Sequence, residues 1–317
     1  MKVTKKSLLA IGITLFLLLL AQPAWAVSAQ SERKVLTLEL LQERLRSPIN
    51  REGVPTLDLR QLVIDLRPEN ASFRDSFYQL LRTQLQRAGS NPLGLDLSHS
   101  LIQGDLNGSD LGLRTPYGQA LAPIFTPTEL EQLERDRQRL AQLKGISRSF
   151  LGSSLVAPLQ ITVFRGPLKL VQTRFTGSVN TNTFFLQPVE APGAIFIQEA
   201  NWTETRFSRD VSFAGATFRQ AASFRGSIFL VNAEFNQAQF QESAIFTGST
   251  FKNTANFNQA SFKQMANFSR VQWLGNADFF QARYSGQALF TKDQFNQSFF
   301  LTYDDPGVCK PPRFIRW

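Results

Sequence analysis

The chain has 317 residues, of which 43% are hydrophobic, and this is the composition of a folded protein with about two domains. Its formal net charge is +9, and no block of like charges concentrates that excess. A single cysteine, Cys309, excludes an intramolecular disulfide and a metal site made of several thiolates.

The first 26 residues have the three parts of a secretory signal peptide. A positively charged N-terminal stretch precedes an apolar run from Leu8 to Ala21, and the small-x-small triplet Ala24-Trp25-Ala26 follows. The run of about 14 residues is shorter than the roughly 20 that a membrane-spanning helix needs, and no second span follows it. We expect cleavage between Ala26 and Val27 and export to the periplasm or an equivalent lumen, with an uncleaved N-terminal anchor as the alternative.

Residues 27–160 are expected to form a mixed region with three helices. The first is a short amphipathic stretch, Leu36–Arg46, and the second runs from about residue 70 to residue 88. The third begins after Thr126, which forms a capping box with Glu129. Its apolar face is made by four leucines: Leu130, Leu133, Leu140 and Leu143.

Between the second and third helices, residues 95–113 carry a leucine-based pattern. After Leu95-Asp96-Leu97, leucines recur at five-residue intervals as far as Leu111. Similar triplets occur earlier, at Leu57-Asp58-Leu59 and Ile64-Asp65-Leu66. We interpret this stretch as a short, imperfect version of the longer repeat that follows.

The clearest feature of the chain is an aromatic repeat within residues 161–300. Aromatic residues follow one another at alternating steps of six and five, and in most cases a small residue such as Ala255 lies two positions before each. A one-residue slip near Asn180 separates the strict part from a looser beginning at Phe164. The strict ladder comprises Phe207, Phe213, Phe218, Phe224, Phe229, Phe235, Phe240, Phe246, Phe251, Phe257, Phe262, Phe268, Trp273, Phe279, Tyr284, Phe290 and Phe295.

This spacing fits a stack of strands and not a helix. On an α-helix at about 100° per residue, steps of five and six would scatter the aromatic side chains around the axis. On a strand, residues i and i−2 point to the same side, so each aromatic and its small partner face one interior. The repeat therefore predicts a β-solenoid with polar corners between short strands.

Three triplets of the repeat resemble the Ala-Asp/Asn-Leu/Phe-x-x unit of the pentapeptide-repeat family: Ala255-Asn256-Phe257, Ala266-Asn267-Phe268 and Ala277-Asp278-Phe279. The form here is Phe-rich, of the kind abundant in photosynthetic bacteria, and the resemblance covers about residues 160–300 and the leucine stretch. It implies a mainly β fold, a right-handed quadrilateral β-helix, after a mixed helical N-terminal region. The sequence inserts a sixth residue in every second unit, so a four-sided coil would have about 22 residues instead of about 20, with a bulge on two sides.

We expect no catalytic, cofactor-binding or metal-binding residue. His99, the only histidine, has no visible partner for a triad or a metal site and fits an exposed corner of the repeat. Asp105-x-Asn107-x-Ser109 resembles a calcium loop but lacks the later bidentate glutamate.

Two residue groups would suit a protein that acts on polysaccharides. Trp202, Trp273 and Tyr284 are candidates for stacking on sugars, but all three fall on the interior register of the repeat. Glycoside hydrolysis needs paired carboxylates, and the acids of the repeat are scattered along it: Glu234, Glu242, Asp278 and Asp293.

These patterns predict a non-enzymatic, exported protein that serves as an interaction or structural scaffold in the cell envelope, with an unidentified protein as its partner. A β-helix that binds or acts on polysaccharide is the alternative. The pentapeptide-repeat family also includes DNA-mimicking gyrase inhibitors, which need an acidic face and a cytoplasmic location. Residues 200–317 hold 12 Lys and Arg against 8 Asp and Glu, and a signal peptide is present, so we expect no nucleic-acid-related partner.

Residues 301–317 are expected to form an irregular tail, because three prolines interrupt them and no periodic apolar face could make a capping helix. Two outcomes are open for the last coil. The tail folds over it through Phe314, Ile315 and Trp317, or the coil stays open and its strand edges associate with a second copy or a partner.

Overall fold

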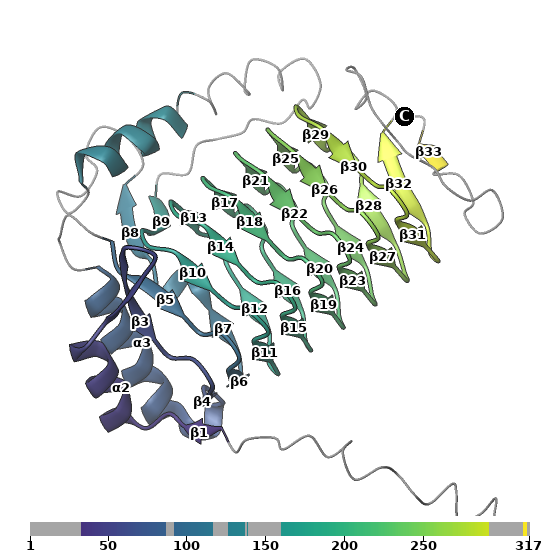
Figure 1. Ribbon diagram of the computed structural model, residues 1–317. Helices are drawn as coiled ribbons and strands as arrows, with labels where there is room; N and C mark the ends of the chain where they lie inside the picture. The colour runs from purple at the N-terminus through teal and green to yellow at the C-terminus, as the bar shows by residue number, and fades with distance from the viewer. Residues whose placement is uncertain are drawn as a thin grey trace, which may run out of the picture. The chain divides into compact units, whose positions relative to one another are not determined.

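A computed structural model describes residues 33–86, 92–116, 126–136, 138, 160–291 and 313–315. The segment Lys34–Trp317 is one compact unit, in which short strands wind as successive turns of a β-solenoid (Figure 1). Two helices, α2 (Leu38–Arg46) and α3 (Ala71–Leu85), lie at its N-terminal end. The predicted fold class is therefore confirmed, whereas the predicted cleavage site at Ala26 and Val27 lies outside the described residues.

Within the described residues, four sheets of seven to nine strands each form the sides of the solenoid. Sheet A has nine strands, β1 (Lys34–Val35), β4 (Leu62–Asp65), β6 (Leu101–Gln103), β11 (Arg174–Phe175), β15 (Ile195–Phe196), β19 (Thr217–Phe218), β23 (Gln239–Phe240), β27 (Ser261–Phe262) and β31 (Arg283–Tyr284). Sheet B also has nine, β2 (Ile49–Arg51), β3 (Val54–Asp58), β5 (Gly94–Asp96), β10 (Leu168–Lys169), β14 (Val189–Glu190), β18 (Val211–Ser212), β22 (Ala233–Glu234), β26 (Ala255–Asn256) and β30 (Ala277–Asp278).

The other two sides complete each coil. Sheet C has eight strands, β7 (Leu106–Asn107), β12 (Val179–Asn180), β16 (Ala200–Asn201), β20 (Ala222–Ser223), β24 (Ala244–Ile245), β28 (Ala266–Phe268), β32 (Ala288–Thr291) and β33 (Arg313–Ile315). Sheet D has seven, β8 (Leu113–Pro116), β9 (Gln160–Phe164), β13 (Phe184–Phe185), β17 (Arg206–Phe207), β21 (Ile228–Phe229), β25 (Thr250–Phe251) and β29 (Gln272–Trp273). Along the chain, each coil of the repeat passes through sheets B, A, C and D in turn.

The register between coils gives the repeat length directly. In sheet A, Phe218 lies opposite Phe240, and equivalent polar side chains in adjacent coils are 22 residues apart. One coil is a residue shorter, because Leu168 pairs with Val189. Sheet D has regained the full spacing at Phe184, which pairs with Arg206. The missing residue therefore lies shortly before β13, which confirms the predicted slip near Asn180.

The interior is a packed column of aromatic rings. Within sheet A, Phe240 stacks face to face on Phe218 at 4.8 Å and on Phe262 at 4.9 Å between ring centroids. Between sheets the rings meet edge to face, as Phe246 of sheet C does with Phe235 of sheet B at 5.4 Å and 89°. Both geometries are favourable for aromatic pairs, so the coils of the strict repeat are held to their neighbours through four stacks.

Two kinds of corner alternate around the solenoid. The five-residue steps turn through a residue in the left-handed region, for example Gln259 at φ 56° and Gly248 at φ 67°. At the six-residue steps the extra residue makes a wider bend without positive φ, and Gly275 there lies close to the backbone of Asn253 in the preceding coil. The alternation of five and six residues thus reflects two corner geometries.

The Asp or Asn that precedes the interior aromatic has a defined local role. Oδ1 of Asn267 accepts a hydrogen bond from the Ser269 amide at 3.0 Å, and Oδ1 of Asp278 accepts one from the Phe280 amide at 2.8 Å. Each such bond closes a side-chain turn directly after the strand. This explains why the Ala-Asp/Asn-Phe triplet recurs.

The leucine-based stretch forms strands of the same sheets. Leu57 pairs with Leu95 and Leu95 with Leu168 in sheet B, whereas Ile64 pairs with Ile102 in sheet A. Residues on both sides of position 160 therefore belong to one continuous solenoid. It begins with β3 and β4, well before the residue at which the strict repeat becomes visible in the sequence.

Helix α3 closes the N-terminal end of the aromatic column. The face of α3 made by Phe73, Phe77, Leu81 and Leu85 is buried in the main core. A short 3-10 turn, η2 (Pro68–Asn70), leads into α3, and a second, η3 (Gly108–Asp110), follows β7. Helix α2 packs against α3 and ends at Arg46, and its C-cap residue Ser47 directly precedes Pro48.

The C-terminal tail is not wholly irregular. Its described residues form β33, which continues sheet C as a parallel strand with Phe314 opposite Phe290. The end of sheet C at β32 is thus covered by the tail. Phe295, Asp293 and Cys309 lie outside the described residues.

Candidate functional site

The interior of the repeat leaves no room for a ligand at the predicted aromatic positions. Trp202 and Trp273 are 1% and 6% exposed, and both point into the aromatic column. Tyr284 is half-buried and stacks on Phe262. None of the three is placed to stack on a sugar from outside, so they act as substitutes for phenylalanine in the core.

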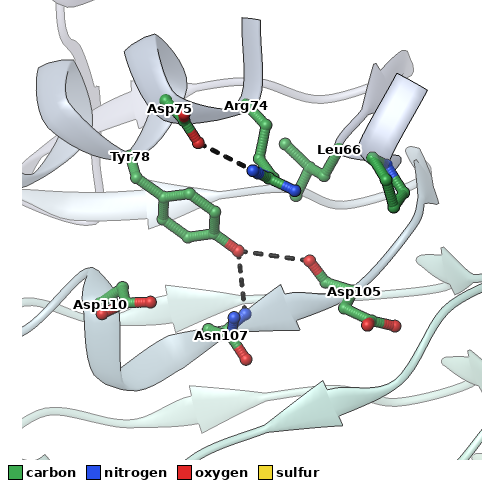
Figure 2. A pocket seen from close by; sticks show the side chains of 8 residues that line it. Leu66, Arg74, Asp75, Tyr78, Asp105, Asn107 and Asp110 are labelled. Carbon is green, nitrogen blue, oxygen red and sulfur yellow. Dashed lines mark hydrogen bonds and ion pairs between the residues drawn. The ribbon is translucent and has the colours of Figure 1, made fainter. Parts of the chain in front are cut away.

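The clearest concave site lies at the N-terminal end, between α3 and the β7 edge of sheet C (Figure 2). Its volume is about 330 Å³. It is lined by Leu66, Pro68, Arg74, Asp75, Tyr78, Asp105, Asn107 and Asp110. Arg74 turns its guanidinium to the neighbouring Asp75, with Nε and Oδ1 3.1 Å apart.

Tyr78 is the central side chain of this pocket. Its hydroxyl donates to the carbonyl oxygen of Asp105 at 3.3 Å and accepts from the amide of Asn107 at 2.9 Å. Burial raises the pKa of Tyr78 to about 12, so the phenol stays protonated at neutral pH. A protonated, doubly hydrogen-bonded tyrosine is a poor general base, and its partners are backbone groups of β7 and the residues before it.

Arg82 of α3 and Gln86, its C-cap residue, continue the stripe that begins at Tyr78 at intervals of four residues. Nε of Arg82 donates to the Asp110 carbonyl at 2.8 Å, and Nε2 of Gln86 donates to the Gly112 carbonyl at 3.1 Å. Strand β7 is the first strand of sheet C, so these backbone groups have no preceding coil to pair with. Tyr78, Arg82 and Gln86 therefore cap the open edge of the first complete coil.

The polar residues that the sequence offered as site candidates form hydrogen bonds with the neighbouring coil. His99 is exposed at a corner with φ 61°, and its amide donates to the Val171 carbonyl in the next coil. Asp105 accepts from the Ser178 amide at 2.8 Å, and Ser109 accepts from the Asn182 amide at 3.0 Å. These oxygens join two coils instead of surrounding a cation. Within the described ranges, no group of three or more His, Cys, Asp or Glu gathers in a way that could hold a metal ion.

The acids of the repeat are less scattered than their sequence positions suggested. Glu234 and Asp278 lie in one outward column of sheet B, separated by Asn256, whose amide donates to Glu234 at 2.7 Å. Glu242 lies at an exposed corner after sheet A. Sequence reasoning missed this column because it depends on the 22-residue register.

A network of ions covers the first coils of sheet B. Asp58 lies between Arg44 and Arg60, with a shortest contact of 2.8 Å to Nε of Arg60. The hydrogen bond from Arg60 is the main reason that the pKa of Asp58 is lowered from its ordinary value. Lys169 of β10 bridges Glu52 at 2.9 Å and Glu190 at 3.4 Å, which links the turn between β2 and β3 to β10 and β14.

The outer face of sheet A has a different charge pattern. Arg219, Lys263 and Arg283 are exposed on it, and within the described part of the chain none of them forms an ion pair. Their neighbours in the same outward columns are uncharged, for example Gln239 and Gln241. Sheet A therefore presents basic groups on a flat polar surface.

A third helix covers the first strands of sheet D. Residues 127–136 are helical, and the predicted capping box is confirmed, since the Glu129 amide donates to Oγ1 of Thr126 at 3.2 Å and the Thr126 amide to Glu129 at 2.7 Å. Glu129 also forms a two-bond ion pair with Arg165, with both contacts at 2.7 Å and both side chains buried. Leu133 packs in a cluster with Phe184 and Leu186 on the outer side of the sheet. Leu130, predicted to share its buried face, is instead 37% exposed, and Leu140 and Leu143 lie outside the described residues.

These features define a solenoid protein with a solid interior and capped first coils. A family model described as pentapeptide repeats (9 copies) matches residues 203–250 and 246–292. Residues 203–292 of the chain therefore belong to the pentapeptide-repeat family. No curated protein and no solved structure matches it significantly. Of the helices in the described ranges, none has the length and apolar character needed to cross a bilayer.

Proposed function

We propose that this protein is an exported, non-enzymatic scaffold of the cell envelope that binds a protein partner through the flat outer face of sheet A. The family is generally non-catalytic, and the central side chain of the pocket described above makes backbone hydrogen bonds that cap an edge. Because the aromatic rings fill the coils, binding would use the outer faces.

The exposed bases of sheet A are the observation that carries this proposal. Arg219 and Lys263 occupy one outward column two coils apart, and Arg283 lies in the adjacent column. Strands about 4.8 Å apart place the first two roughly 10 Å from each other. A rigid row of guanidinium and ammonium groups at fixed spacing fits an acidic, extended protein surface.

Co-purification after chemical cross-linking in envelope fractions tests the proposal. We expect a defined partner whose cross-links map to sheet A. A glycan array tests the polysaccharide alternative, because selective glycan retention without a protein partner would favour that alternative. A basic face on sheet A argues against DNA mimicry, which needs an acidic one.

Export is supported by the lysine-rich start, the apolar run and the Ala24-Trp25-Ala26 triplet. N-terminal sequencing of the protein from its native cell is expected to begin near Val27 in a non-cytosolic fraction. A soluble cytosolic protein that begins at Met1 would contradict the proposed location.

Association with a second copy is a separate part of the proposal. Among the described strands, β30 and β31 are the last of sheets B and A, and strand edges pair readily with other strands. We expect light scattering to detect a dimer at high micromolar concentration. A strict monomer in which the amides of β30 and β31 are protected from hydrogen exchange would contradict it.

A further inference from the structure

The outward charges of sheets A and B alternate from coil to coil. On sheet A, bases lie on or directly after β11, β19 and β27, and the strands between them, β15 and β23, carry none. On sheet B, acids lie on β14, β22 and β30, whereas β18 and β26 between them carry Ser212 and Asn256. The corner before β18 holds both Arg209 and Asp210, whose charges offset each other. The bases are Arg174, Arg219 and Lys263, and the acids are Glu190, Glu234 and Asp278.

The two sets are offset by one coil. Each coil passes through sheet B before sheet A, so β11 shares a coil with β10, and β14 begins the next coil (Figure 1). Every one of the three bases therefore lies one coil before one of the three acids. Neighbouring strands are about 4.8 Å apart, so a shift of about 4.8 Å between two copies brings all three bases level with the three acids.

The charged groups of both sets are available for contact. Arg219 and Lys263 are exposed and Arg174 is half-buried, and within the described ranges none of the three forms an ion pair. The carboxylates of Glu234 and Asp278 are half-buried, and in the hydrogen bonds of the described residues each accepts with one oxygen only. Sheet A thus offers unpaired cations, and sheet B offers carboxylates that can accept further hydrogen bonds.

The remaining charges set the relative direction of the two copies. The three pairs align with parallel axes after a shift of one coil, and also with antiparallel axes when β11 faces β30. In the antiparallel arrangement Arg283 of β31 would face Lys169 of β10, which brings two like charges together. In the parallel arrangement Arg283 lies beyond β30, the last described strand of sheet B, and Lys169 faces β6, which carries no base. The parallel arrangement is therefore favoured.

We propose that sheet A of one copy binds sheet B of a second copy, with parallel axes and a shift of one coil. The contact rests on the function proposed above, because it makes another molecule of this chain the protein partner of sheet A. The two faces differ, so the contact is heterologous and continues from copy to copy. Its ion pairs are Arg174 with Glu190, Arg219 with Glu234, and Lys263 with Asp278.

The uncharged coils between these pairs also match. In this register β23 faces β26, so Gln239 lies opposite Asn256, and both amides donate and accept hydrogen bonds. Strand β15 faces β18, which sets the outward, half-buried Ile195 and Ile197 opposite Ser212, a small residue. Like charges do not meet in either coil.

Disulfide cross-linking between two distinguishable copies tests the register. Cys309→Ser gives a background without thiols. One purified copy carries Lys263→Cys, and the other, with a tag of different length, carries Asp278→Cys. We expect a mixed disulfide dimer from this pair under mild oxidation at low ionic strength. Lys263→Cys with Glu190→Cys, which meet only in the antiparallel arrangement, is the matched control. No mixed dimer from the first pair, or an equal yield from the control, would overturn the proposal.

A charge exchange in the same assay gives a second measurement. Arg219→Glu in the Lys263→Cys copy sets two carboxylates opposite each other and should lower the cross-linking yield roughly fivefold. Glu234→Lys in the Asp278→Cys copy should restore the yield when it is combined with Arg219→Glu. About 0.5 M sodium chloride should reduce the parental yield, because exposed ion pairs are screened by salt. No recovery in the exchanged pair, or a yield that does not depend on salt, would contradict the proposed contact.

These measurements use the purified protein, whereas the proposed function is tested in envelope fractions, so the two can fail separately. Envelope partners that cross-link to sheet A, without a contact between Lys263 and Asp278 of purified copies, would overturn the second-copy contact and leave the proposed function standing. A cross-link between these positions in a protein found only in the cytosol would support the contact and contradict the envelope role.

Discussion

Phe246 lies in the middle of the interior column, and its truncation to alanine measures how much the aromatic stacks contribute to stability. The side chain is 0% exposed. It stacks on Phe224 and Phe268 at 5.0 Å on either side and meets Phe235 and Phe257 edge-on at 5.4 and 5.3 Å.

The expected cost of Phe246→Ala is roughly 3–5 kcal/mol, the range for a buried phenylalanine that leaves a cavity. We expect a value in the upper half of that range. The coils above and below are fixed by backbone hydrogen bonds, such as that from the Phe246 amide to the Asn267 carbonyl at 2.8 Å, so they cannot collapse into the space. The aromatic pairs also contribute beyond their buried area.

Gln259 supplies the matched control at a corner. It is exposed, its backbone has φ 56°, and its side chain bonds to Gln237 and Gln281 at 3.1 Å each. Gln259→Gly suits the left-handed backbone, so we expect its effect to stay within about 1 kcal/mol. Gln259→Ala should show a similarly small loss, from the exposed hydrogen bonds.

Urea denaturation followed by circular dichroism and tryptophan fluorescence measures these differences, with coincident transitions as the check on two-state behaviour. A lower midpoint at constant slope for Phe246→Ala, with both Gln259 variants near the parent, is the expected result. Comparable losses in all three variants would refute the assignment of interior and corner positions.

Three further predictions address the caps and corners. The folded-state pKa of Tyr78 is raised from 10.0 to about 12, so the contribution of its phenol to stability is present below pH 10 and is lost as the pH rises towards 12. Between these pH values, the free energy of unfolding should fall more steeply for the parent than for Tyr78→Phe. Arg165→Met should lower the free energy of unfolding by about 3–5 kcal/mol, because it leaves Glu129 buried without its partner. Adding Glu129→Gln should recover much of this loss in a double-mutant cycle, and additive losses would contradict the pairing. Gly275→Ala should destabilise the protein more than Gly248→Ala in the same urea assay. A Cβ at Gly275 would lie 2.5 Å from a backbone oxygen, whereas a Cβ at Gly248 would meet nothing within 4 Å. Equal effects would argue against two kinds of corner.

The interior of the fold was predictable because its positions repeat one physical requirement. A phenylalanine two residues after a small side chain satisfies the inside of a strand, and the pattern survives in coil after coil. The slip near Asn180 was visible for the same reason. The capping box at Thr126 and Glu129 is a local signal over three residues, and it too was correct.

Contacts between distant segments could not be predicted in this way. The first coils are separated by α3 and by the excursion between β8 and β9, which hides the pairing of Leu57 with Leu95 and of Leu95 with Leu168. The stripe that begins at Tyr78 on α3 has no sequence signature, because its partners are backbone groups. Strand β33 was missed since three residues after two prolines carry no periodic signal.

The most direct test of the proposed role compares cross-linked partners of the parent protein with those of two charge-reversal variants. One variant carries Arg219→Glu, Lys263→Glu and Arg283→Glu on sheet A, and the control carries Arg209→Glu and Arg225→Glu, which are exposed on other sides. Stability should be nearly unchanged in both, because these side chains are at the surface. Loss of the partner from the sheet A variant alone is the predicted result. Recovery of the same proteins with all three forms would contradict the claim that this protein acts through the basic face of its solenoid.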